Sequence, residues 1–222
     1  AGLPINVGQN NFDRIRYDYY RDQTVALEAF KSHRYDIRSE NASLVWATGY
    51  NFPARKAGRV KLEEVEHARP TGMQAFVFNI RREQFQDPVL RRAMAYAFDF
   101  EWSNRNLFYG QYARTSSYFS NSDLAATALP SKAELALLAP WRGKIPDEVF
   151  TEIYAPPATD GSGNIRRNLR TGLRLLKGAG YKIENNKLIS PRTGKPVEFE
   201  ILLVSPAFER IVSPFAQNLK RL

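Results

Sequence analysis

The chain has 222 residues, of which 43% are hydrophobic and 13% aromatic, and its formal net charge is +9. This content is enough to bury the core of one large domain or of two smaller ones. The absence of Cys excludes disulfides, thiolate catalysis and zinc held by sulfur, and no apolar run approaches the ~20 residues of a membrane helix.

The positive charge comes from 32 Lys and Arg against 23 Asp and Glu. The basic residues are spread along the chain, and no run reaches five like charges. This spread favours an ordinary solvated surface over a polyanion-binding face. The alternative, a basic nucleic-acid-binding protein, predicts retention on heparin or DNA that falls steeply with salt.

The first third of the chain alternates short predicted strands with one helix. Residues 12–20 alternate as a strand with one apolar face. A helix follows, capped by Asp22 or Thr24, with a buried stripe made of Val25, Ala26, Ala29 and Phe30. Further strands are expected at 35–37 and, near a sheet edge, at 60–66. Residues 69–72 form a break that is the candidate crossing between two lobes.

The stretch 71–110 is the most informative part of the sequence. An apolar strand at 75–79 precedes a helix that starts at Asp87-Pro88, where the carboxylate caps free backbone N–H groups and the Pro lacks one. Asp99 restarts a second helix, which ends near Gly110. The pattern predicts a strand followed by two short capped helices.

The second half begins with a loop-rich segment, 111–164, that contains one capped helix at 131–138 with a Ser131/Glu134 capping box. Another amphipathic helix is predicted to begin near Asn164. Asn185-Asn186 indicates a hairpin, and residues 197–204 form an almost continuously apolar strand. The apolar stripe of the last helix, from 207, continues to residue 222, so we expect the chain to be part of a longer protein.

Residues that could carry chemistry are few. The two histidines, His33 and His67, lie 34 positions apart without carboxylate neighbours at metal-ligand spacing. The Gly-rich loop 160–164 lacks the Lys and Ser/Thr of a phosphate loop, so a turn with a helix cap is the better account. We predict no catalytic residue, no metal site and no cofactor, although a Ser-His-Asp hydrolase stays open because such triads are spatial.

Several motifs in this order resemble the family 5 extracellular solute-binding proteins, the peptide-binding components of ABC importers. The resemblance lies in Asn79, Phe85 and Asp87 followed by VLRRAMAYAFD (89–99), in YDI (35–37), and in LLKGAGY (175–181). The amino-acid sequence of residues 6–13, 46–50 and 107–112 looks most like that of the YejA-type subgroup of the family. Together these motifs cover nearly the whole chain.

The resemblance implies an α/β protein, part of a two-lobed periplasmic-binding-protein type II fold, with mixed sheets and flanking helices. Residues 1–68 would belong to the first lobe and 69–222 to most of the second. The protein would be a periplasmic, monomeric receptor rather than an enzyme. It would bind dipeptides or oligopeptides between the lobes and deliver them to a permease in the inner membrane, with no nucleic-acid partner and no cofactor.

Five residues are predicted to line the ligand site. Aromatic rings in loops can line a cleft or can anchor the loops on a core, and an arginine offers a fork for a carboxylate. The predicted lining residues are Trp46, Tyr50, Arg69, Tyr118 and Phe119. The resemblance transfers no peptide-anchoring carboxylate to this sequence.

Overall fold

The computed structural model describes residues 3–9 and 11–222, which form two compact units. Unit 1 comprises Ala1–Glu63 and unit 2 comprises Glu64–Leu222. The break between them lies inside the predicted strand 60–66, a few residues before the break expected at 69–72. The assignment of 1–68 and 69–222 to two lobes stays a prediction.

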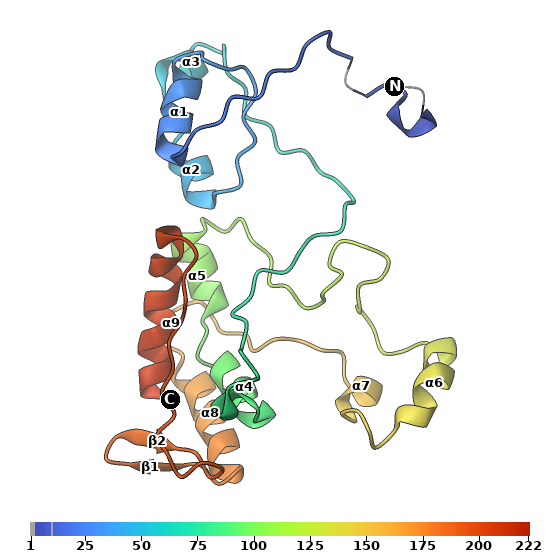
Figure 1. The fold of residues 1–222 in the computed structure, drawn as a ribbon, viewed down its shortest axis with the longest axis vertical. Helices are drawn as coiled ribbons and strands as arrows, with labels where there is room; N and C mark the ends of the chain where they lie inside the picture. The colour runs from blue at the N-terminus through green and yellow to red at the C-terminus, as the bar shows by residue number, and fades with distance from the viewer. Residues whose placement is uncertain (1–2, 10) are drawn as a thin grey trace. The chain divides into compact units, whose positions relative to one another are not determined.

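Unit 1 is a small helical unit with one core. Its elements are η1 (Pro4–Asn6), α1 (Gln23–Lys31), α2 (Ser43–Thr48) and α3 (Pro53–Lys56) (Figure 1). Asp22 caps α1, since its carboxylate accepts from the backbone N–H groups of Thr24 and Val25. The side chain of Val25 is 56% exposed, so its predicted place in the buried stripe is wrong, and Leu27 takes it.

Unit 2 contains the remaining elements. Its longer helices are α4 (Pro88–Ala95), α5 (Phe100–Leu107), α8 (Arg166–Gly178) and α9 (Glu209–Arg221). The short elements are η2 (Glu83–Phe85), α6 (Lys132–Leu138), η3 (Ala139–Trp141), α7 (Glu148–Thr151) and η4 (Pro206–Phe208). The predicted capping box of Ser131 and Glu134 is present at the start of α6.

The core of unit 2 is centred on the packing of α4 against α8. The predicted cap Asp87 accepts from Val89 N at 2.8 Å and from the Tyr181 hydroxyl at 2.7 Å, so it joins the start of α4 to the chain just after α8. A Cβ at Gly172 would lie 3.1 Å from the carbonyl oxygen of Ala93. Glycine at this position therefore lets the two helices approach closely.

The described residues contain one sheet, an antiparallel hairpin. Strand β1 (Lys182–Glu184) pairs with β2 (Lys187–Ile189), as the Asn185-Asn186 signal predicts. Both asparagines have positive φ, 50° and 59°, as a two-residue turn of the primed type requires.

The predicted mixed sheets are not confirmed. Residues 12–20, 35–37, 60–66, 75–79 and 197–204 are not strands in the structure, because a strand needs a continuous ladder of hydrogen bonds to a neighbour. The segment 197–204 has only the start of one among the described residues, where Val197 N donates to the carbonyl oxygen of Leu188 at 2.8 Å beside the isolated bridge of Ile189 with Pro196. Two of these segments nevertheless keep the alternation of a strand. Phe76 and Phe199 pack on the helical core, whereas Val77 and Leu202 are each 91% exposed.

Candidate ligand-binding site

Three of the five predicted ligand residues lie in one local assembly of unit 2, which we call the loop pair: residues 67–71 and 117–126. Thr71 N and Oγ1 donate to the carbonyl oxygen of Ser120 at 2.9 and 3.2 Å. The Asn121 side-chain amide donates to the carbonyl oxygens of His67 and Arg69, at 2.9 and 2.8 Å. These bonds bring Arg69 next to the turn that carries Tyr118 and Phe119.

The turn in the loop pair is built by short polar side chains. Ser117 Oγ accepts from Phe119 N at 3.2 Å and from Ala126 N at 3.3 Å, and Ser120 Oγ donates back to the carbonyl of Ser117 at 2.9 Å. Asn121 has φ 60°, a left-handed conformation that asparagine tolerates better than most residues. Backbone groups are thus satisfied locally, and the rings do not need to anchor the turn.

The side chains of the loop pair face solvent. Tyr118 is 78% exposed and Phe119 54% exposed. Arg69 is exposed, and its guanidinium has no ion pair or hydrogen bond within the described part of the chain. The assembly therefore offers two rings and one free guanidinium to a partner. Rings and a guanidinium suit a peptide with a carboxylate.

Each of the two histidines lies in a loop or turn of the backbone. His67 Nδ1 accepts from the backbone N–H of Arg69 at 3.2 Å, which stabilises the bend of the first loop. His33 lies in the exposed turn after α1 with φ 57°.

Trp46 and Tyr50, the other two predicted residues, belong to the aromatic core of unit 1. Tyr50 is only 4% exposed, and its ring lies 6.0 Å from Trp46 and 6.3 Å from Phe30 in edge-on contacts. Trp46 is half-buried at the border of this core. Tyr50 thus packs beneath Trp46, and of the two only Trp46 has surface available to a ligand.

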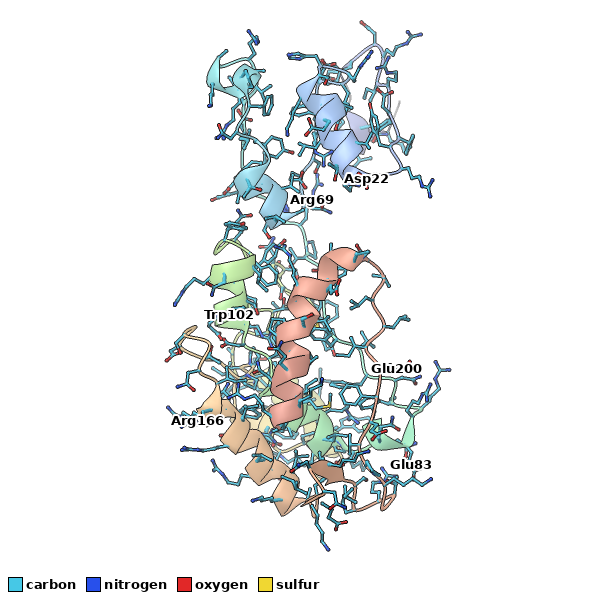
Figure 2. All side chains as sticks on the ribbon, turned by 90° about the vertical axis from the view of Figure 1, so that its left-hand side faces the viewer. Asp22, Arg69, Glu83, Trp102, Arg166 and Glu200 are labelled. Atoms are coloured by element: carbon cyan, nitrogen blue, oxygen red, sulfur yellow. The ribbon has the colours of Figure 1, made fainter. Side chains whose placement is uncertain are left out.

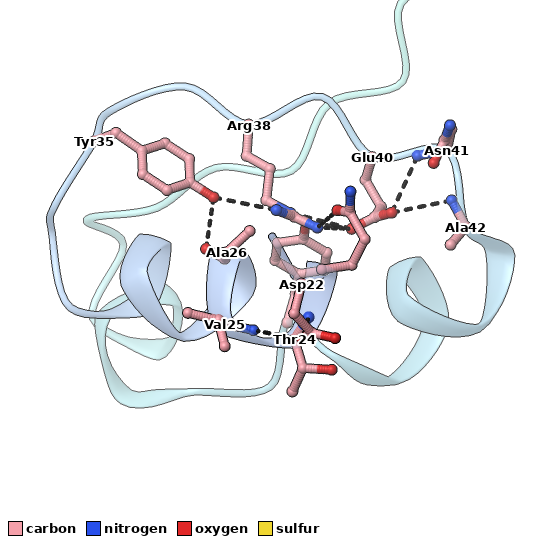
Figure 3. A network of polar contacts seen from close by, with 11 residues as sticks. Asp22, Thr24, Val25, Ala26, Tyr35, Arg38, Glu40, Asn41 and Ala42 are labelled. Carbon is pink, nitrogen blue, oxygen red and sulfur yellow. Dashed lines mark hydrogen bonds and ion pairs between the residues drawn. The ribbon is translucent and has the colours of Figure 1, made fainter. Parts of the chain in front are cut away.

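Sequence reasoning missed a buried polar network in unit 1 (Figure 3). Arg38 forms an ion pair with Glu40 at 3.1 Å, and the two side chains are only 8% and 4% exposed. The Tyr50 hydroxyl donates to Glu40 at 3.0 Å and accepts from Arg38, while Arg38 also reaches the Tyr35 hydroxyl at 3.1 Å. Residues at i and i+2 of an extended segment lie on the same side of it. The spacing of Arg38 and Glu40 was therefore the one sign in the sequence that these two side chains could pair.

The network also organises the backbone around it. The second Glu40 oxygen accepts from the N–H groups of Asn41 and Ala42, just before α2. Burial raises the pKa of Tyr50 above its usual value. A neutral Tyr50 hydroxyl can act as donor and acceptor at once, which is what the two charged neighbours require.

Two surface hollows of unit 2 are lined by other residues. One, of about 490 Å³, lies beside the first turn of α8 and is lined by Tyr96, Ala158, Thr159, Asp160, Asn164, Arg167, Asn168 and Thr171. The other, of about 300 Å³, lies between α5 and α9. None of the five predicted residues lines either hollow.

Neither a cluster of metal ligands nor a membrane-spanning helix is present in residues 3–9 and 11–222. They contain no group of three or more His, Asp or Glu side chains placed to hold a metal ion. No helix among them is both long and apolar enough to cross a bilayer.

Comparison with known proteins places these features in a family. Residues 6–222 match the pattern of the bacterial extracellular solute-binding proteins, family 5 Middle. A probable peptide-binding protein YejA of Agrobacterium fabrum is 46% identical over 220 residues, which are 98% of this chain and 36% of that protein. YejA of Escherichia coli is 43% identical over 222 residues, which are 100% of this chain and 37% of that protein.

A third relative, the peptidoglycan-binding protein YepA of Agrobacterium fabrum, is 39% identical over 225 residues, which are 98% of this chain and 36% of YepA. The chain thus spans little more than a third of the length of these relatives. The match over residues 6–222 agrees with the order of motifs in the sequence, and it implies a two-lobed binding-protein fold. The chain belongs to the family 5 bacterial extracellular solute-binding proteins and is of the YejA type.

Proposed function

We propose that the protein is the substrate-binding component of an ABC importer, which binds peptides between two lobes and delivers them to a permease in the inner membrane. The observation that carries this proposal is the family match over residues 6–222, together with a relative named as a probable peptide-binding protein. The protein would work in the periplasm as a monomer, without catalysis and without a cofactor.

The loop pair is the proposed contact surface for the peptide in unit 2. Tyr118 and Phe119 present exposed rings that can cover apolar parts of a peptide. The free guanidinium of Arg69 can bind a terminal carboxylate through two parallel hydrogen bonds. In unit 1 we propose Trp46 as the contact residue, with Tyr50 as the buried support that positions it.

Ligand binding would close the two lobes around a hinge. A peptide that contacts both lobes binds the closed form more tightly than the open form, so it shifts the population toward closure. Only the closed, loaded form would then be recognised by the permease.

The class of ligand is tested by thermal unfolding of the full-length protein against a peptide library. A ligand that binds only the folded state at a hundred times its Kd adds about 2.7 kcal/mol, enough to raise the Tm by several degrees. A library in which no peptide raises the Tm would show that the ligand class is wrong.

The role of Arg69 is tested with matched ligands, a binding peptide with a free C-terminal carboxylate and the same peptide amidated. We expect Arg69→Gln to weaken binding of the free peptide by about tenfold or more, since it removes a charge-assisted pair, and to leave the amidated peptide unchanged. Arg81→Gln, which neutralises another exposed arginine, is the control. Equal weakening of both peptides would contradict carboxylate recognition by Arg69.

A further inference from the structure

Helix α8 carries a narrow line of positive charge, which we call the cationic stripe: Arg166, Arg167, Arg170, Arg174 and Lys177. At about 100° per residue, these five positions fall within a sector of roughly 100° on the helix. All five side chains are exposed, while Leu169 and Leu176 on the opposite side are buried. Figure 2 labels Arg166 at the first turn of this helix.

The charges of the cationic stripe have no acidic partner among residues 3–9 and 11–222. Helix α8 contains no acidic residue. Within the described residues, none of the five side chains forms an ion pair or donates a hydrogen bond to a neighbour. By contrast, Lys31 of α1 pairs with Glu28 one turn earlier in the same helix.

The arrangement works against the stability of its own helix. Like charges four residues apart, as in Arg166 with Arg170 and Arg170 with Arg174, repel each other. Arg166 and Arg167 also stand in the first turn, where the positive end of the helix dipole disfavours cations, and the N-cap residue Ile165 has no capping side chain. Charges that destabilise their own helix are found in proteins mainly where they serve a function other than stability.

We propose that the cationic stripe is a docking surface for the anionic phospholipid headgroups of the membrane. From Arg166 to Lys177 the stripe is straight and about 17 Å long at 1.5 Å per residue, a shape that suits a flat, diffusely charged surface. Because the apolar side of α8 is buried in unit 2, the helix does not insert. The contact is peripheral, electrostatic and sensitive to salt.

This inference rests on the proposed function only for location, since an importer component works beside the inner membrane. Docking through α8 would keep the receptor near the permease between rounds of delivery. It does not depend on which solute is bound, so a failure of peptide binding and a failure of membrane docking can be told apart.

The test is co-sedimentation of the full-length protein with vesicles of phosphatidylcholine, with or without phosphatidylglycerol. The variant is Arg166→Gln/Arg170→Gln/Arg174→Gln. Its control is Lys56→Gln/Arg59→Gln/Lys61→Gln, which removes the same three charges from exposed positions of unit 1. We expect the α8 variant to bind phosphatidylglycerol vesicles at least about tenfold more weakly than the parent, and the control to differ by less than about twofold.

Three results would overturn the proposal. The first is equal loss in the variant and the control, which would indicate non-specific attraction by net charge. The second is loss of binding in Arg166→Lys/Arg170→Lys/Arg174→Lys, which keeps the charge. The third is that the parent does not bind phosphatidylglycerol vesicles at low salt. If it then binds vesicles that contain the permease, or duplex DNA, the cationic stripe belongs to that other partner.

Discussion

The two units of the molecule are stabilised in different ways. The core of unit 1 has five buried apolar residues, and the Arg38–Glu40 ion pair with the two tyrosine hydroxyls lies against them. The core of unit 2 has two clusters of aliphatic and aromatic side chains beneath its helices, and its ion pairs Arg92–Glu148 and Lys187–Glu198 are exposed.

This difference predicts where the protein is sensitive to substitution. A small core that surrounds a buried charge pair depends on both partners, because removal of one leaves the other desolvated and unpaired. A larger apolar core distributes its stability over many contacts, each of moderate size. Unit 1 should therefore respond more strongly to one polar substitution than unit 2 does to any of its own.

The largest effect is expected for Glu40→Gln. The change leaves the buried Arg38 without its counter-charge, which costs about 3–5 kcal/mol. Hydrogen exchange of the α1 and α2 amides should accelerate accordingly, while the amides of α4 and α8 stay protected. Glu148→Gln, which breaks the exposed pair with Arg92, is the control and should change neither region. Unchanged exchange in unit 1 would show that the ion pair is dispensable.

The next effect is expected for Leu176→Ala in unit 2. Leu176 is fully buried between α8 and α4, so truncation removes apolar contacts and leaves a cavity, at a cost of about 2–5 kcal/mol. Urea unfolding followed by circular dichroism measures it. Leu176→Met, of similar volume, should cost less than about 1.5 kcal/mol. If both variants were equally destabilised, shape rather than burial would determine stability here.

A smaller effect is expected for Tyr181→Phe. The substitution keeps the buried ring and removes the hydroxyl that donates to Asp87, at a cost of about 1–3 kcal/mol because a carboxylate oxygen loses its partner. The same unfolding measurement applies. A loss as large as that of Leu176→Ala would mean that unit 2 also depends on a polar link, and the contrast between the units would then fail.

The smallest effect is expected in the pH dependence of the free energy of unfolding above about pH 10, where Tyr181 contributes. Burial, and then the hydrogen bond to Asp87, raise the pKa of Tyr181 above its usual value. The unfolded state releases this proton from about pH 10 upward, while the folded state retains it. The contribution of Tyr181 is therefore complete below pH 10 and declines above it. The free energy of unfolding should fall less steeply above pH 10 in Tyr181→Phe than in the parent.

Much of the helical structure was predictable because its signals are local. Asp22, Asp87 and Asp99 each accept from a backbone N–H within three residues, and the hairpin depends on the two asparagines at its turn. Both partners of such a contact lie within a few residues of each other, so the sequence shows them together. The pairing of Tyr181 with Asp87, 94 positions apart, was not predicted, although each residue belonged to a recognised motif.

The strands and part of the site could not be predicted in the same way. Alternation at 75–79 and 197–204 shows which side of each segment faces the core, yet a strand also requires a partner chain. For Tyr50, ring and hydroxyl were visible in the sequence, but the buried charges that surround them come from Arg38 and Glu40, which a one-dimensional pattern does not place. The turn that joins Arg69 to Phe119 likewise depends on Asn121, a residue with no motif of its own.

The exposed apolar sides of the unpaired segments have a practical consequence for handling this polypeptide. Val77, Leu202 and Val204 are each about 90% exposed and belong to no strand among the described residues. Unpaired backbone of this kind can template strand addition from another molecule. Glu198 and Glu200, on the same side of their segment, are charges of the kind that slow this process. When residues 1–222 are produced alone, protein concentration and ionic strength will therefore govern colloidal behaviour, because salt screens the two carboxylates.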